Sequence, residues 1–188
     1  MNSFKTLALA AIVSLLCGVT QANIVQNGDF TQSTGWTVSN IYEVGYGYGC
    51  LYMDADNNGF QVTSHTIAAG ETFHVSWDSR TDAGFTGPNL MRAYLFYFDG
   101  PDGFELTHQD CMTTFDYVTS TFDFTAIEGA EYIGKSVGIV LRNAEPVESW
   151  ASFANVSIDI TTVPEPATML ILGAGGLLAL GRKLRKQA

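Results

Sequence analysis

Apolar and polar residues alternate through the middle of the chain, and this two-residue period limits the fold more than any other feature. Residues 72–79 are the clearest case, because Phe73, Val75 and Trp77 fall on one face and polar residues on the other. Successive side chains of a strand point to opposite faces of a sheet, so the pattern predicts a half-buried strand. No window has a sustained helical period. The middle of the chain is therefore expected to be all-β.

Similar segments recur with turn residues between them, which is typical of a β-sandwich. The expected strands are 23–26, 35–38, 51–53, 60–67, 72–79, 90–98, 104–107, 117–124, 136–141 and 150–160. Residues 42–49 alternate tyrosine with glycine and are expected to form a loop or an irregular edge. A doubly wound α/β fold would need helices between the strands, and the sequence has no pattern for them.

Both ends of the chain are apolar and are expected to be targeting segments. Lys5, an apolar run at 7–16 and small residues before Ala22 are typical of a secretory signal peptide. Residues 1–22 are therefore expected to direct export through the Sec translocon. Residues 23–163, about the length of one domain, are left to fold.

At the other end, a short motif, an apolar run and a basic tail follow one another. The run is 167–181 and the tail is 182–188. The motif is Pro164, Glu165 and Pro166, and the cations of the tail are Arg182, Lys183, Arg185 and Lys186. Such cations mark the cytoplasmic end of a membrane segment. The run is shorter than the roughly 20 residues of a comfortable span and is rich in glycine, which favours a transient transmembrane segment.

These three parts in this order resemble the PEP-CTERM sorting signal, whose C-terminal region is also called the ice-binding protein C-terminal domain. The resemblance covers 164–188 and implies recognition by the membrane enzyme exosortase. It also implies export across the inner membrane of a Gram-negative-type bacterium to the cell surface or extracellular matrix, with exopolysaccharide or biofilm as the surroundings. A plain membrane anchor is the alternative, and the sequence leaves open whether the tail is cleaved or retained.

Acidic residues dominate 23–163 and limit its partners. The segment holds 18 of the 19 acidic residues and four of the nine basic ones, a net charge of −14. Such a surface repels nucleic acid and anionic lipid, and it can attract divalent cations.

The same segment holds two cysteines, Cys50 and Cys111. An even number of cysteines in an exported chain favours a disulfide between them. Two buried thiols are the alternative.

Two short segments, one at each end of the domain, resemble the frame of galactose-binding-like jelly rolls, a group that includes carbohydrate-binding modules. They are the run from Asn27 to Trp36 and the run 153–158. The resemblance implies a jelly-roll β-sandwich. Thr31 and Ala154 stand where that family has acidic ligands of a structural calcium ion, so the resemblance does not carry this site over.

A separate candidate for calcium lies at Asp54, Asp56 and Asn58, which place oxygen-bearing side chains on alternate residues before Gly59. This spacing is typical of a calcium-binding loop. An EF-hand would require a glutamate where the chain has His65. A hairpin turn, in which asparagine and glycine tolerate a positive φ, is the alternative. Calcium is the one cofactor that the sequence suggests.

Aromatic residues supply the candidate ligand-binding surface, because aromatic rings stack on sugars while polar neighbours bind hydroxyl groups. The candidates are Trp36, Tyr42, Tyr46 and Tyr48. The tyrosines lie in a glycine-rich stretch and are expected to be exposed. The strand pattern around Trp36 also permits a place in the core.

No catalytic arrangement is evident in the sequence. His65, His74 and His108 are scattered, and no serine lies in a nucleophile elbow. We therefore expect a non-catalytic exported protein that binds carbohydrate, such as exopolysaccharide, or has a structural role beside it. The alternatives are a small secreted carbohydrate-active enzyme and a membrane-anchored scaffold without a ligand.

Overall fold

The computed structural model describes residues 19–21, 23–32, 34–39, 44–47, 49–82, 88–145 and 149–162. Gln21–Thr161 forms one compact unit, and Met1–Thr20 with Thr162–Ala188 forms another, of which the structure describes only 19, 20 and 162. The predicted transmembrane run and most of the predicted signal peptide therefore lie outside the described residues. Within the described part, the structure has no helix of the length and apolar character that a membrane span requires.

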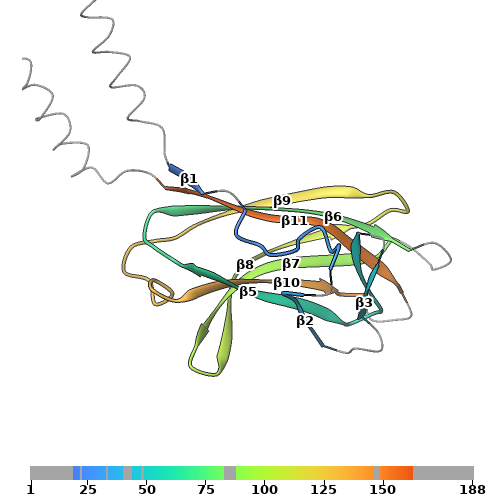
Figure 1. Cartoon of the computed structure of the whole chain (residues 1–188), viewed down its shortest axis with the longest axis horizontal. Coiled ribbons are helices and arrows are strands. Elements are labelled where there is room, and N and C mark those ends of the chain that lie inside the picture. The colour runs from blue at the N-terminus through green and yellow to red at the C-terminus, as the bar shows by residue number, and fades with distance from the viewer. Residues whose placement is uncertain are drawn as a thin grey trace, which may run out of the picture. The chain divides into compact units, whose positions relative to one another are not determined.

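The described residues of the larger unit form strands arranged in two sheets (Figure 1). The order is β3-β4-β11-β6-β9 in the first sheet and β2-β5-β10-β7-β8 in the second. The strands are β1 (Val19–Gln21), β2 (Thr37–Val38), β3 (Val44–Gly47), β4 (Cys50–Met53), β5 (Asn58–Thr66), β6 (Glu71–Thr81), β7 (Leu90–Asp99), β8 (Asp102–Met112), β9 (Val118–Thr125), β10 (Ser136–Asn143) and β11 (Ala151–Thr162). The predicted all-β sandwich is confirmed.

The core lies between the two sheets, because the strands of each turn an apolar face inward. In β6, every second residue from Glu71 to Thr81 is buried, as the alternation predicts. From the other sheet, β10 contributes Val137, Ile139 and Leu141, all fully buried. Removing apolar surface from water stabilises the fold by roughly 25 cal/mol per Å², so this shared core holds the two sheets together.

The segments that differ from the predictions lie at edges. Residues 23–26 form no strand, and the Asn23 side chain accepts a 3.0 Å hydrogen bond from the Val25 N–H. The expected loop at 42–49 contains β3, an edge strand paired with β4. Strand β8 is longer than the expected 104–107. Most of its residues are exposed, so its sequence lacks the apolar alternation from which its full length could have been predicted.

The predicted disulfide between Cys50 and Cys111 is wrong for this structure, in which both residues are thiols. In β4, Leu51 and Met53 face the core, so alternation turns Cys50 toward the outer face of the first sheet. Cys111 lies between the sheets, with its Sγ 3.4 Å from the Oγ of buried Ser79. The first sheet therefore lies between the two sulfur atoms.

Two tyrosines have raised pKa values, from which we expect the protein to lose stability at high pH. The Tyr97 hydroxyl donates a 2.8 Å hydrogen bond to the Glu131 carboxylate, which raises the pKa of Tyr97 to about 12. Burial, and then the Cys50 thiol, raise the pKa of Tyr117 to about 12. Both values return to about 10 on unfolding, so the stabilisation is complete below about pH 10 and is lost as the pH rises toward about 12.

Urea unfolding measured from about pH 8 to about pH 12 should show the free energy of unfolding falling only above about pH 10. The Tyr97→Phe variant should show a shallower fall, because it has one fewer phenol to titrate. Identical pH curves for the variant and the parent protein would contradict this account.

Candidate functional site

The outer face of the second sheet carries aromatic residues that the strand register aligns. Across β10, Val140 pairs with Phe60 of β5 on one side and with Tyr94 of β7 on the other. Two residues along, Gly138 pairs with Phe96 of β7. Because residues of one face alternate along a strand, the next outer residue of β7 follows in the same row. We call this surface the aromatic face, and it consists of Phe60, Tyr94, Phe96, Phe98 and Val140.

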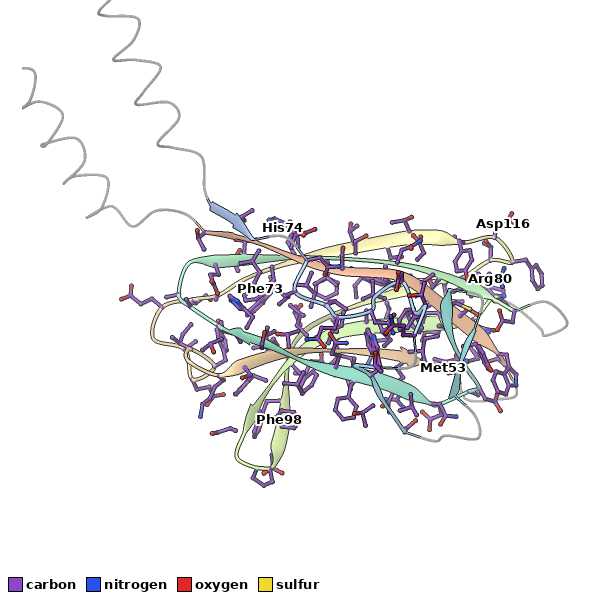
Figure 2. The ribbon with its side chains drawn as sticks, viewed as in Figure 1. Met53, Phe73, His74, Arg80, Phe98 and Asp116 are labelled. Atoms are coloured by element: carbon purple, nitrogen blue, oxygen red, sulfur yellow. The ribbon has the colours of Figure 1, made fainter. Side chains whose placement is uncertain are left out.

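A groove of about 480 Å³ lies over the aromatic face. It is lined by Asn58, Phe60, Tyr94, Phe96, Phe98, Gly103, Glu105 and Val140. The Phe96 ring is edge-on to Phe60 at 6.2 Å and to Phe98 at 5.2 Å, so the three rings fix one another's orientation. Phe96 is nearly covered, whereas Phe98 is half-buried on the hairpin of β7 and β8 (Figures 1 and 2).

A bulge in β8 shapes the far wall of this groove. Leu95 pairs with Thr107, but the next residue, Phe96, pairs with Glu105. Leu106 is therefore an extra residue in β8, and its side chain packs against the core. A bulge bends a strand and changes where its side chains point, and here it leaves Glu105 on the wall of the groove.

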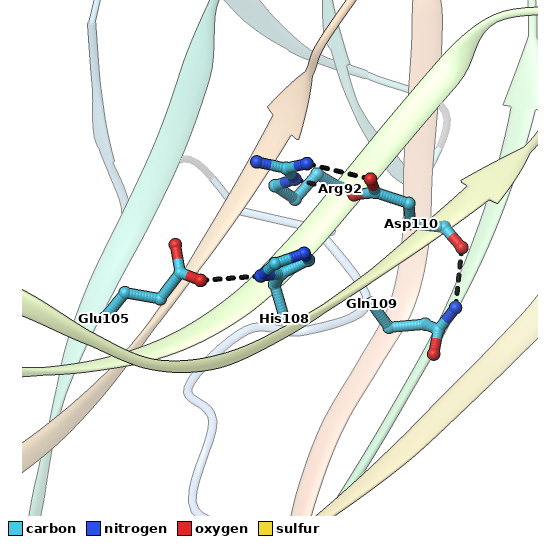
Figure 3. A network of polar contacts seen from close by, with 5 residues as sticks. All are labelled: Arg92, Glu105, His108, Gln109 and Asp110. Atoms are coloured by element: carbon cyan, nitrogen blue, oxygen red, sulfur yellow. Dashed lines mark hydrogen bonds and ion pairs between the residues drawn. The ribbon is translucent and has the colours of Figure 1, made fainter.

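Charged pairs border the aromatic face on β7 and β8 (Figure 3). Arg92 donates from Nε and Nη2 to the two oxygens of Asp110, at 2.6 and 2.8 Å. This bidentate hydrogen bond raises the pKa of Arg92 and lowers that of Asp110. Beside it, His108 Nδ1 lies 2.6 Å from Glu105, and the Gln109 amide donates to the Asp110 carbonyl at 2.7 Å. The groove thus has a polar border that can exchange hydrogen bonds with a ligand.

The residues predicted to bind calcium are used within the turn between β4 and β5. Asp54 Oδ1 accepts a 2.7 Å hydrogen bond from the Ala55 N–H, and Asp56 forms an ion pair with Arg142. Asp56 has a φ of 57°, which is typical of a tight turn. Asn58 begins β5 and lines the groove. Among the described residues, no three histidine, cysteine, aspartate or glutamate side chains are grouped to hold a metal ion.

The predicted aromatic ligand residues do not lie on the aromatic face where the structure describes them. Trp36 is 8% exposed and packs 5.1 Å from Phe30, so it belongs to the core. Tyr46 is placed by its backbone in β3, and its side chain is outside the described part. Tyr42 and Tyr48 also lie outside it.

The sequence contains a signal for the aromatic face that points to no function by itself. Tyr94, Phe96 and Phe98 alternate with Leu95 and Tyr97, so both faces of β7 are apolar. A sheet with one face on the core buries only one of these sets. The other set must be covered or must form a surface available for binding.

A hydroxyl, an imidazole and a carboxylate form a row on the outer face of the first sheet. His74 Nε2 lies 3.0 Å from Thr161 Oγ1, and Nδ1 lies 2.8 Å from Asp123. This order matches a nucleophile, a base and an orienting group. However, the backbone of β6 at His74 is paired in the sheet ladder, so its N–H groups are not grouped to hold an oxyanion. The row is most simply a cross-strand polar contact.

Solved structures with the same arrangement of two sheets are jelly-roll β-sandwiches. A CBM4 structure matches with a TM-score of 0.55 and 19% identity, over 71% of this chain and 97% of that one. The CBM22-1 xylan-binding domain from Paenibacillus barcinonensis matches with 0.55 and 13%, over 78% and 97%. A cyclase from Fischerella sp. TAU matches with 0.63 and 16%, over 78% and 100%. Identities this low show a shared fold.

The C-terminal part of the chain matches a family model. Residues 162–186 match the PEP-CTERM protein-sorting motif, which confirms the resemblance found at 164–188. The motif marks an exported protein for processing by exosortase and for association with the surface or membrane. No curated protein sequence matches the chain.

Proposed function

We propose that this exported protein is a carbohydrate-binding module whose ligand lies in the groove over the aromatic face. The observation that carries the proposal is the set of four aromatic side chains from β5 and β7 in an open groove with a polar border. Aromatic rings pack against the C–H faces of sugars, and carboxylates and amides such as Glu105 and Asn58 accept and donate hydrogen bonds to hydroxyl groups.

The proposed ligand is a polysaccharide of the cell surface or its surrounding matrix. The sorting motif at 162–186 supports delivery to that location. The fold is similar to that of a xylan-binding domain and of a cellulose-binding domain, and this similarity supports the ligand class. The role is proposed to be non-catalytic, because the described lining of the groove has one carboxylate, Glu105, whereas glycoside hydrolysis generally uses two.

A second candidate function is binding or conversion of a small aromatic molecule in the same groove. Three of the eight lining residues are phenylalanine, which has no polar group to bind a hydroxyl. A similar cyclase from Fischerella sp. TAU was solved in complex with 4-(1H-indol-3-yl)butan-2-one. Calorimetric titration with that indole and with xylohexaose would separate the two candidate functions. Saturable binding of xylohexaose alone would support the first, and saturable binding of the indole alone would support the second.

Replacing Phe98 with alanine is expected to weaken saccharide binding at least tenfold. Phe98 is half-buried on the hairpin, so its loss removes a stacking surface with little effect on the core. A tenfold change corresponds to about 1.4 kcal/mol. Calorimetric titration with xylan, with β-glucan and with polysaccharide from the surface of the bacterium that makes this protein would measure the change in affinity.

The matched control is Phe115→Ala, because Phe115 is 61% exposed and lines a different pocket. The control should bind as the parent protein does. Unchanged binding by Phe98→Ala, together with a loss in Phe115→Ala, would move the site away from the aromatic face.

A further inference from the structure

Two arginines lie directly opposite each other at one end of the aromatic face. Arg142 of β10 pairs in register with Arg92 of β7. Like charges in such a pair repel each other and destabilise the sheet. Each guanidinium also forms an ion pair with a carboxylate from a neighbouring segment. Arg92 pairs with Asp110, and Arg142 pairs with Asp56. The row Asp56, Arg142, Arg92 and Asp110 therefore crosses the second sheet beside the aromatic residues.

These two arginines keep unused hydrogen-bond donors. A guanidinium has five N–H donors, and Asp110 takes one from Nε and one from Nη2 of Arg92, which within the described part of the chain leaves both hydrogens of Nη1 and one of Nη2. Arg142 bonds to Asp56 through Nη2, and its buried Nε has no partner in the described part of the chain. Turning Arg142 toward a ligand would thus cost no hydrogen bond at Nε.

The two carboxylates differ in how firmly they are held. Asp110 makes a bidentate contact and is half-buried, and the hydrogen bond with Arg92 lowers its pKa. Asp56 contacts one nitrogen of Arg142 and is 68% exposed. A single exposed ion pair contributes little to stability, because water screens its charges. Asp56 is therefore the carboxylate that an incoming anion would displace.

The arginine row is close enough to the groove to act on the same ligand. Tyr94 is two residues from Arg92 along β7, a separation of roughly 7 Å. Burial raises the pKa of Tyr94, the charge of Arg142 opposes that rise, Glu105 adds to it, and Arg92 opposes it, so both guanidinium groups and the Glu105 carboxylate act at its hydroxyl. A sugar ring over Tyr94 would thus place a ring substituent at the arginines.

We propose that Arg92 and Arg142 bind the carboxylate of an acidic sugar, so that the ligand is a uronic acid-containing saccharide. This inference rests on the proposed function. A carboxylate between the two guanidinium groups would relieve their repulsion and use donors that have no partner. The distant acidic residues of the chain act little on this site, because charges beyond about 10 Å are largely screened at ordinary salt. The nearby carboxylates are already in contact with other groups, Asp56 and Asp110 with the arginines and Glu105 with His108.

Calorimetry of the full chain with hexagalacturonate and with its methyl ester would test the inference, because the two probes differ in carboxylate charge. The acid is expected to bind about tenfold more tightly than the ester. Arg142→Gln should abolish this preference. Asp56→Asn should strengthen binding of the acid severalfold and leave the ester unchanged, because asparagine suits the same φ and no longer competes for Arg142.

The outcomes separate this inference from the proposed function. One outcome is that xylohexaose binds and needs Phe98, the protein binds the acid and the ester equally, and Asp56→Asn gives no gain. The arginines would then have only a structural role in the sheet. The proposed function would then survive and the inference would fail. If no saccharide binds to the parent protein, both fail. Urea unfolding of each variant would establish that it is folded.

Discussion

Replacing Trp77 with alanine is expected to lower the free energy of unfolding by about 3–5 kcal/mol. Trp77 is the largest side chain of β6 that faces the core, and it is fully buried against an edge-on Phe122 ring at 5.9 Å. Deleting it leaves a cavity between the sheets that the surrounding strands cannot close. Urea unfolding at neutral pH would measure the change.

Trp77→Phe is the matched control, because the indole Nε1 is buried with no hydrogen-bond partner in the described residues. Phenylalanine keeps much of the packing and removes an unsatisfied donor, so its cost should be much smaller than that of alanine. Equal losses for the two variants would mean that packing at Trp77 is not what stabilises the sandwich.

Replacing Gly138 with valine is expected to abolish ligand binding and to destabilise the fold by about 1–3 kcal/mol. A Cβ at Gly138 would overlap the Phe96 ring and would lie 2.7 Å from the Gln61 carbonyl oxygen. Phe96 would have to leave its position between Phe60 and Phe98, and the groove would lose its floor. Calorimetry and urea unfolding of the same sample would separate the two effects.

Gly103→Ala is the control in the same groove. A Cβ at Gly103 would be 3.6 Å from the Phe98 ring, an ordinary van der Waals contact. This variant should unfold as the parent protein does, and any loss of binding should be far smaller than that of Gly138→Val, because Phe96 keeps its position. Wild-type binding by Gly138→Val would show that the position of Phe96 does not matter to the site.

Central strands could be predicted from the sequence, because burial on one face imposes a strict pattern on them. β6 alternates cleanly between buried and half-buried residues, β10 is a run of buried apolar residues, and neither is an edge strand of its sheet. β8 is an edge strand with mostly exposed residues, so its sequence lacks that pattern and the predicted strand was too short. β3 is also an edge strand, and its alternation of glycine with tyrosine was expected to form a loop. The pairing of two cysteines was inferred from their number, whereas the pleat of β4 turns Cys50 away from the core, on which Cys111 of β8 packs.

The candidate site could not be predicted for a related reason. Aromatic residues on both sides of β7 do not reveal which side faces the core, and only the packing of the two sheets decides it. The facing of Arg92 and Arg142 depends on the register between β7 and β10, which are distant in sequence. The sequence predicted ligand binding by the tyrosines of the glycine-rich residues 42–48, whereas the described groove is formed by Phe60, Tyr94, Phe96 and Phe98 together with polar neighbours.

Mapping of a bound oligosaccharide by two-dimensional NMR tests the central claim most directly. On titration with the tightest-binding saccharide, the shifted resonances are predicted to belong to the outer faces of β5, β10, β7 and β8, with Phe60, Tyr94 and Phe98 among the largest. Shifts gathered instead on β6 and β9 around His74 and Asp123, or on β3 and β4, would contradict the assignment of the ligand to the aromatic face.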